Sequence, residues 1–370
     1  MPQPNTFPNE IWLLVAVESH GRGLTGIAGA STHMRNMLIS HLAERLRFQG
    51  TQGEVVTARH NLQDTQLLRY DRTSRLPPIL PFVRRVAIVV NEAVPAIPIV
   101  PDGQLPLPTG GIDLPVEIAR LLVSSQIPTF DSLFLDIWDM HLTQVSLMIG
   151  KMSTSKKVAA KCFRIRCQPH GNHPTVCCLE PATLKALYLY EEPCITMLIP
   201  SATEFHHIER LRFQIPSPIL YFKLGMAFPK LQWLIMCRCD SVSRPEQKFY
   251  SLAQRANQTW FQSRDWIFFH RAVKGLQHLR RLAIHIDPIC TSNSAIRTPD
   301  PDNSRLHGNI SSRALEILPS LEEVCVSTIW PFYWRATRVE GQGIRLERKN
   351  ASGLEQGEDW PYGLFGNGYD

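Results

Sequence analysis

A short apolar pattern recurs along the chain and restricts the folds that are open to it. From the middle of the chain onward, the form apolar-x-x-apolar-x-apolar is found over residues 130–135, 142–147, 160–165, 184–189, 208–213, 231–236, 279–284 and 321–326. The starts from 160 to 231 are 24, 24 and 23 residues apart, and the next two gaps are 48 and 42 residues. Because the last three positions alternate, each segment predicts a short strand with one buried face.

A spacing near 24 residues lies in the range of leucine-rich repeats, in which each unit is a strand with a return segment. One unit cannot bury its apolar face alone, so neighbouring units must stack with parallel strands. The predicted fold class is therefore α/β, an irregular leucine-rich-repeat-like solenoid of parallel strands. One residue of each later strand should lie in a single buried line, formed by Leu187, Leu211, Leu234, Leu282 and Val324. An ordinary α/β sheet with unequal crossovers is the alternative.

Return segments before the last two strands have helical spacing. Residues three or four apart predict one buried helix face in each segment, made by Trp266, Phe269, Val273 and Leu276 in the first and by Ala314, Leu315 and Leu318 in the second.

Three segments depart from the repeat. Residues 94–115, "VPAIPIVPDGQLPLPTGGIDLP", are rich in Pro and Gly and predict an extended loop. Residues 290–309 are polar and predict an exposed insertion, and residues 338–370 lose the apolar pattern and predict a poorly ordered tail. The aromatic cluster "WPFYW" at 330–334 follows the last predicted strand and is either an end cap or a partner-binding patch.

The first fifty residues contain a G-x-G-x-x-G sequence, Gly21 to Gly26, that invites a dinucleotide-binding interpretation. In such sites the glycines follow a buried strand directly, whereas polar residues 18–20 intervene here. Ile11, Leu14 and Val15 instead have helical spacing, and Pro8 suits the first turn of a helix. We therefore predict a first helix here and two more over about 24–30 and 34–46, with the glycines in a turn between helices.

With these helices in place, residues 7–48 resemble an F-box. The resemblance rests on Phe7-Pro8-x-Glu10-Ile11, on Leu24-x-x-Ile27-Ala28-x-Ala30-Ser31, and on His33-Met34-Arg35 with Leu38 and Leu42-x-x-Arg45-Leu46-x-Phe48. It departs from the family in the four glycines between positions 21 and 29 and in Phe7, where Leu is commonest. The family docks onto a Skp-type adaptor that links it to a cullin-based ubiquitin ligase. The resemblance implies adaptor-binding residues Pro8, Ile11, Leu14, Leu38 and Leu42.

An F-box-like start that runs into irregular leucine-rich strands resembles the large fungal set of F-box/repeat proteins. The resemblance thus implies a three-helix F-box-like module (1–50), a leucine-rich-repeat-like region (51–337) with loops near 94–115 and 290–309, and the tail (338–370).

Composition excludes several classes of protein. With 44% hydrophobic and 19% charged residues the chain is globular, and its net charge of +6 is spread along the sequence. We expect no nucleic-acid partner, because no basic arm is present, and no membrane partner, because the longest apolar run, 11–17, is too short to span a bilayer. The start shows no secretory pattern, and nine cysteines in such a chain suggest reduced thiols. The expected location is therefore the cytoplasm or the nucleus.

Six potential zinc ligands occur close together: Cys162, Cys167, His170, His173, Cys177 and Cys178. Their spacing lacks the paired C-x-x-C of a zinc ribbon, and a strand here would turn Cys162 away from a buried Phe163, Ile165 and Cys167. We therefore predict core packing and no metal site. Cys237 with Cys239, and His206 with His207, have no ligand or catalytic pattern around them either.

No G-x-S-x-G, P-loop or H-E-x-x-H motif occurs, so we predict no catalytic residues, no cofactor and no enzymatic activity. The predicted function is a substrate-receptor subunit of an SCF-type ubiquitin ligase that binds a client through its repeats. A repeat scaffold for protein–protein interaction unrelated to ubiquitin is the first alternative, and an enzyme with unrecognised motifs is the second.

Overall fold

The computed structural model describes residues 38–39, 42–70, 79–91, 113–190, 204–214, 221–237, 275–285, 308, 311–327 and 332–350. The chain is mixed α/β and divides into two compact units, Met1–Lys161 and Cys162–Asp370. In each unit the described strands lie in the sheet in the order in which they occur along the chain. Neighbouring strands pair in parallel from β1 to β3 and from β4 to β9, and the β9–β10 and β10–β11 pairs are antiparallel.

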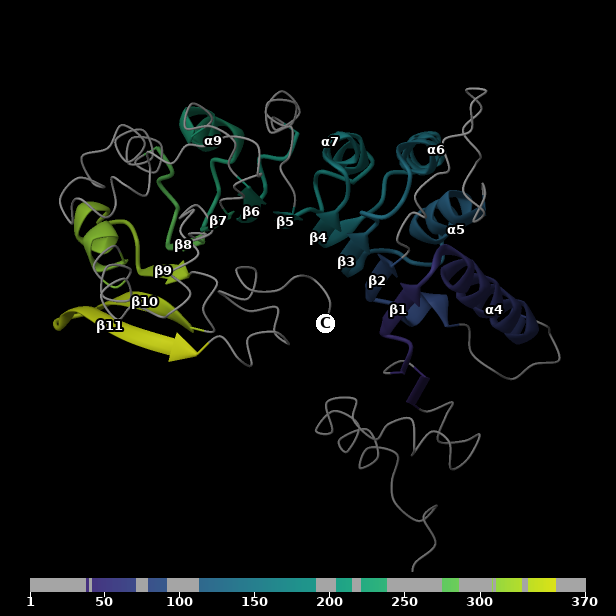
Figure 1. Ribbon diagram of the computed structural model, residues 1–370, viewed down its shortest axis with the longest axis horizontal. Coiled ribbons are helices and arrows are strands. Elements are labelled where there is room, and N and C mark those ends of the chain that lie inside the picture. Colours follow the sequence, from purple (N-terminus) through teal and green to yellow (C-terminus); the bar gives the residue numbers. More distant parts are fainter. Residues whose placement is uncertain are drawn as a thin grey trace, which may run out of the picture. The chain divides into compact units, whose positions relative to one another are not determined.

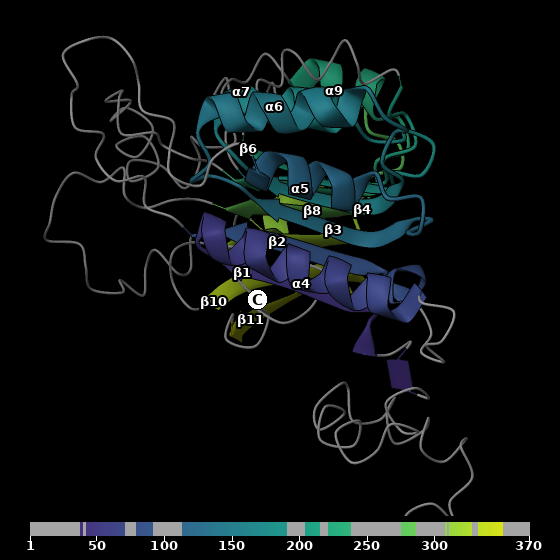
Figure 2. The ribbon, with the colours of Figure 1, turned by 90° about the vertical axis from the view of Figure 1, so that its right-hand side faces the viewer.

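The first unit places helices on one side of three strands, as Figures 1 and 2 show. Its elements are β1 (Arg45–Gly50), α4 (Gln52–Tyr70), the short η2 (Leu80–Phe82), β2 (Arg85–Val90), α5 (Asp113–Leu122), β3 (Phe130–Asp136) and α6 (Leu142–Ser153). Phe48, Ile88 and Leu135 lie opposite one another across the three strands and are buried.

The second unit repeats this arrangement over more strands. Its elements are β4 (Ala160–Arg166, of which residues from Cys162 on belong to this unit), α7 (Pro169–Cys177), β5 (Ala186–Leu189), β6 (Arg210–Gln214), α9 (Tyr221–Ala227), β7 (Trp233–Cys237), β8 (Arg281–His285), a helix over residues 311–317, β9 (Glu323–Ser327), β10 (Phe332–Val339) and β11 (Gly343–Asn350). Helices α7 and α9 lie on the same side of these strands (Figure 1).

The predicted buried line is confirmed. Register pairs Leu187 with Leu211, Leu211 with Leu234, Leu234 with Leu282 and Leu282 with Val324, always between parallel strands. All five side chains are at most 3% exposed. Phe163 of β4 pairs with Leu187 and extends the line by one strand.

Hydrogen bonds before the strands show why the spacing repeats. In the motifs that start at 184, 208, 231, 279 and 321, the first apolar residue lies before its strand and donates its N–H to the carbonyl three residues earlier, as in Ile208 to Phe205 and Leu231 to Phe228. One carbonyl then accepts from two consecutive N–H groups of the next strand, as Glu209 does from Gln232 and Trp233. These turns recur from one repeat to the next, so each strand starts in the same register as its neighbour.

Seven of the eight predicted segments contain strands, and one prediction is wrong. Residues 142–147 belong to helix α6, because the apolar spacing continues as Val145, Met148 and Met152, all buried on one helix face. His141 caps this helix, and its backbone N–H donates to Gln144 Oε1 at 3.0 Å.

The second predicted return helix is also confirmed. Residues 311–317 are helical, and Ala314, Leu315 and Leu318 are at most 1% exposed. Of the first return segment, Leu276 is buried and residues 266–273 lie outside the described residues.

Two boundaries differ from the prediction. The helix expected to run to about Leu46 gives way to β1 at Arg45, because Leu46 and Phe48 follow strand alternation and pair with β2. The loop expected up to Pro115 ends earlier, since α5 starts at Asp113. Pro115 then occupies the first turn, where its missing N–H costs nothing. Residues 94–112 and 290–307 lie outside the described residues.

The poorly ordered tail predicted from residue 338 is wrong as far as residue 350. Strands β10 and β11 form an antiparallel hairpin whose turn contains Gly341 and Gly343 at φ 73° and 86°, a conformation that favours glycine. β11 alternates charged and apolar residues with both faces largely open, which is why its apolar content is low. The end of the "WPFYW" cluster starts β10, in agreement with an end cap on the stack.

No helix among the described residues is long and apolar enough to cross a membrane.

Shortening a side chain of the buried line should lower the free energy of unfolding of the second unit. Leu234→Ala removes a side chain that is 0% exposed, and we expect a loss of about 2–5 kcal/mol in the free energy of unfolding, measured by denaturant titration. Met226→Ala, at a side chain that is 85% exposed, is the control and should change it by less than about 0.5 kcal/mol. Equal effects of the two substitutions would contradict the assigned register.

Candidate functional site

The face of the second unit's sheet opposite the buried line is rich in arginine and aromatic residues. Arg338 shows which face of the sheet the helices cover. It lies on the same face of β10 as the buried Ala336, which pairs with Val324 of the buried line. Its Nη2 donates to the carbonyl of Leu315 in helix 311–317 at 2.6 Å. The helices therefore cover the face of the buried line. Because side chains alternate along a strand, the residues on either side of each leucine of the line point the other way.

We call this opposite side the arginine face. Among the described residues of β4–β11 it carries eight basic and two acidic side chains: Arg164, Arg166, Arg210, Arg212, Arg281, Arg335, Arg345 and Lys349, with Glu323 and Glu347. The strand register brings residues from distant parts of the chain together on this face. Trp233 of β7, for example, lies between Arg210 of β6 and Arg281 of β8.

Aromatic rings lie beneath the guanidinium groups of this face. The Cζ of Arg210 is 3.8 Å from the ring centroid of Trp233, and that of Arg281 is 4.9 Å from the same ring. Arg212 lies 3.9 Å from the ring centroid of Tyr190. Such cation–π contacts offset part of the repulsion among neighbouring cations, and they hold the guanidinium groups flat on the sheet.

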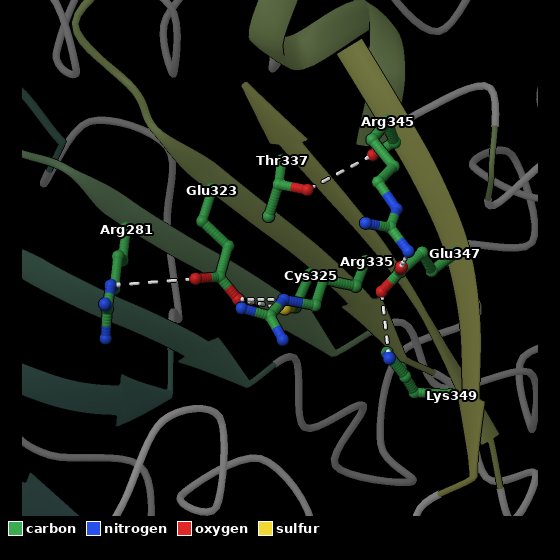
Figure 3. A network of polar contacts seen from close by, with 8 residues as sticks. All are labelled: Arg281, Glu323, Cys325, Arg335, Thr337, Arg345, Glu347 and Lys349. Carbon is green, nitrogen blue, oxygen red and sulfur yellow. Dashed lines mark hydrogen bonds and ion pairs between the residues drawn. The ribbon is translucent and has the colours of Figure 1, made fainter. Parts of the chain in front are cut away.

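Glu323 is the buried carboxylate of this face, and two arginines from neighbouring strands hold it (Figure 3). Its Oε1 lies 2.8 Å from Arg335 Nε on β10, and its Oε2 lies 3.6 Å from Arg281 Nε on β8. The Glu323 side chain is 5% exposed, whereas the two arginine side chains are 36% and 37% exposed. Cys325 Sγ also donates to Oε1 at 3.6 Å. The guanidinium groups thus remain open to solvent around a carboxylate that they bind.

A second carboxylate is held at the edge strand. Glu347 pairs with Arg345 at 2.5 Å and with Lys349 at 2.9 Å, both on β11 (Figure 3). The pKa of Glu347 lies below its ordinary value, chiefly because Lys349 hydrogen bonds to the ionised carboxylate. This glutamate therefore stays ionised.

Buried phenols complete the arginine face. Burial raises the pKa of Tyr333 to about 12 and also raises the pKa of Tyr188, because a phenolate loses its hydration there. Both tyrosines remain neutral at physiological pH, so the arginines keep the face positive.

The first unit has a polar cluster of a different kind. Glu117 of α5 is 4% exposed and lies 2.5 Å from Arg120, 3.8 Å from Arg59 and 4.0 Å from His60 of α4. Glu117 joins α4 and α5, and a role in packing these two helices accounts for this polar cluster.

Three of the predicted adaptor-binding residues, Pro8, Ile11 and Leu14, lie outside the described residues. Leu38 is helical and 0% exposed, and Leu42 is helical and partly exposed. The structure therefore assigns Leu38 a packing contact within the chain.

The cysteine cluster lies as the strand pattern predicts. Phe163, Ile165 and Cys167 are buried on one face, and Cys162 lies on the other, partly exposed. In the part of the chain that the structure describes, no group of three or more His, Cys, Asp or Glu side chains is placed to hold a metal ion. His207 lies on the surface, with Nδ1 3.3 Å from Lys230 Nζ.

The arginine face was missed in the sequence, although a signal for it exists. Positions three and five of each apolar motif point away from the core, and they supply Arg164, Arg210, Arg212, Arg281 and Glu323. Reading those positions down the repeats would have shown the excess of positive charge.

No known protein-family model matches the chain, and no curated protein has significant similarity to it.

Neutralising the buried carboxylate should destabilise the sheet. Glu323→Gln leaves Arg281 and Arg335 without their shared anion, and we expect a loss of about 1–3 kcal/mol in the free energy of unfolding. The neighbouring Glu322, 59% exposed and paired with the exposed Arg280, is the matched control. Glu322→Gln should cost less than about 0.5 kcal/mol in the same denaturant titration, and a larger cost there would refute this view of the network.

Alkaline pH should destabilise the second unit through its buried phenols. The pKa of Tyr333 is about 12 in the folded chain and about 10 when unfolded, so its neutral form stabilises the fold below pH 10. That stabilisation is lost as pH rises from about 10 to about 12. Denaturation midpoints across this range should fall less steeply for Tyr333→Phe than for the unsubstituted chain. Parallel curves would show that Tyr333 does not contribute.

Proposed function

We propose that this chain is the substrate-receptor subunit of an SCF-type ubiquitin ligase. Its N-terminal residues would form a three-helix F-box-like module that binds a Skp-type adaptor and, through it, the cullin complex. The strands that follow would be an irregular leucine-rich-repeat-like solenoid whose exposed face binds a client protein. In this proposal the chain is not an enzyme, needs no cofactor, and acts in the cytoplasm or the nucleus.

One observation carries the proposal: the residues that resemble an F-box run directly into a stack of parallel strands. Residues 45–48 supply both the last part of the resemblance and the first residues of β1. The same turn and the same carbonyl bifurcation then recur from Glu44 and Arg84 in the first unit to Arg280 in the second. A repeating backbone of this kind is a rigid support for side chains that differ from repeat to repeat.

A receptor also needs a surface that distinguishes its client, and the arginine face supports this part of the proposal. It is built on strands, so its side chains are fixed relative to one another. It also combines arginine with aromatic residues, which are enriched where proteins bind one another.

A repeat scaffold unrelated to ubiquitin is the second candidate. The observation that favours it is the full burial of Leu38, because a helix that only caps the first strands would bury such residues against the sheet. The two candidates differ in whether Pro8, Ile11 and Leu14 contact a partner.

Adaptor capture tests the proposal directly. The full chain, co-expressed with a Skp-type adaptor, should co-purify with it. Ile11→Ala or Leu14→Ala should weaken capture by about 1–3 kcal/mol, because each truncates an apolar anchor. The melting temperature of the repeat region should stay nearly unchanged. Leu346→Ala, at an exposed leucine of β11, is the matched control and should not affect capture.

The opposite outcome is equally distinct. If the unsubstituted chain captures no adaptor, and Ile11→Ala and Leu14→Ala both unfold the whole protein, the N-terminal helices are a cap. The scaffold function would then replace the receptor function.

A further inference from the structure

We propose that the arginine face binds an acidic, extended segment of a partner protein, whose carboxylates lie between arginines of neighbouring strands. The inference deepens the proposed function, and it rests on that function only in identifying the partner as a ubiquitin-ligase client. The binding chemistry itself rests on the second unit.

Charge is the first reason. Strands β4–β8 contain five arginines on this face and no acidic residue at all. The two carboxylates of the face lie at its other end, on β9 and β11, where cations hold them already. A partner that crosses β4–β8 therefore meets positive charge on β4, β6 and β8 and no negative charge on any of these strands, so negative charge is its complement.

Glu323 shows how a carboxylate fits this face. It lies between Arg281 and Arg335, which flank its own strand on either side, with Oε1 2.8 Å and Oε2 3.6 Å from their Nε atoms. Neighbouring strands are about 4.8 Å apart, so arginines on adjacent or next-but-one strands can reach one carboxylate from two sides. Arg210 on β6 and Arg281 on β8 flank Trp233 of β7 in one register row, much as Arg281 and Arg335 reach Glu323 from the strands on either side of it, although Arg335 does so diagonally, since its own register partner is Cys325. In that row this chain has an aromatic residue between the two arginines where β9 has Glu323. In our proposal, a carboxylate of the partner takes the role that Glu323 has on β9.

The state of the aromatic rings favours a peptide over a nucleic acid. Single-stranded nucleic acids stack their bases on open aromatic faces. Here Arg210 covers Trp233 at 3.8 Å, Arg212 covers Tyr190 at 3.9 Å, and Arg164 lies 5.4 Å from Tyr188. A guanidinium group that stacks on a ring still presents its N–H edge, and that edge matches a carboxylate.

Three of the arginines are accessible, whereas Arg212 is 7% exposed. Arg210 is exposed, and the side chains of Arg281 and Arg335 are more than one-third exposed. Since strands fix the spacing of these cations, a segment that lies extended across them can place successive carboxylates in successive gaps.

The test uses the full chain and a labelled twelve-residue peptide of alternating glutamate and serine, with binding measured by fluorescence anisotropy. Arg210→Gln removes an exposed cation at the centre of the face, and we expect the dissociation constant to rise about tenfold. Arg313→Gln removes an arginine of similar exposure from the helix on the other side of the sheet, and it should change the constant by less than about twofold. Arg210→Lys keeps the charge without the fork and should fall between the two. Thermal melts of the three variants should coincide, and if Arg210→Gln melts early the Arg210→Lys result decides.

Three outcomes would overturn the proposal. Equal weakening by Arg210→Gln and Arg313→Gln would mean non-specific attraction to a basic protein. Tighter binding of a twelve-nucleotide oligouridine than of the peptide would assign the face to nucleic acid. Residues 351–370 contain four acidic residues and no basic one, so they are a competing occupant. If the peptide binds only a full-length variant with Glu355, Glu358, Asp359 and Asp370 changed to their amides, the face belongs to this chain's own segment.

The two proposals can fail separately. Peptide binding that depends on Arg210, without any adaptor capture, would refute the ubiquitin-ligase function and leave the acidic-segment surface in place. Adaptor capture without peptide binding would leave the receptor function in place and refute the surface.

Discussion

The structure of the second unit depends on one constraint, the common register of its parallel strands. Strands β5 to β9 each contribute a leucine or valine to the same buried line, and these residues are flanked in sequence by residues that face the other way: Arg210 and Arg212 beside Leu211, Arg281 beside Leu282, and Glu323 beside Val324. A slip of one residue would bury these charges and expose the apolar side chains. The register that forms the core is therefore also the register that assembles the arginine face.

That face must tolerate cations held close together, and its own residues supply the compensation. Two guanidinium groups share the ring of Trp233, and the carboxylate of Glu323 neutralises Arg281 and Arg335 at the other end. The contacts to Trp233 use the flat surfaces of the guanidinium groups and the contacts to Glu323 use their N–H edges, a combination that a lysine ammonium in the same places could not make. Arginine thus allows one set of side chains to stabilise the sheet and to present positive charge on it.

Much of the fold was predictable, because the repeat is a local pattern. The motif located seven strands, and the same form is present at residues 43–48 and 83–88, the segments that contain β1 and β2. There it was overlooked, in the first case because Arg45 and Leu46 were assigned to the end of a helix. At 142–147 the pattern misled, since apolar residues three apart suit a helix as well as a strand, and only Met148 and Met152 further on separate the two. β11 escaped notice because a strand with two open faces has little apolar signal.

The candidate site could not be predicted in the same way, because its residues meet only through pairing. Arg210 and Arg281 lie 71 positions apart in the sequence and contact one ring, since β7 pairs directly with β8 whatever the length of chain between them. Insertions at the ends of strands therefore leave the face intact, whereas a single insertion within a strand would exchange its two faces. The composition of the face is thus controlled by a few positions in each repeat, and these positions point away from the buried line behind the face.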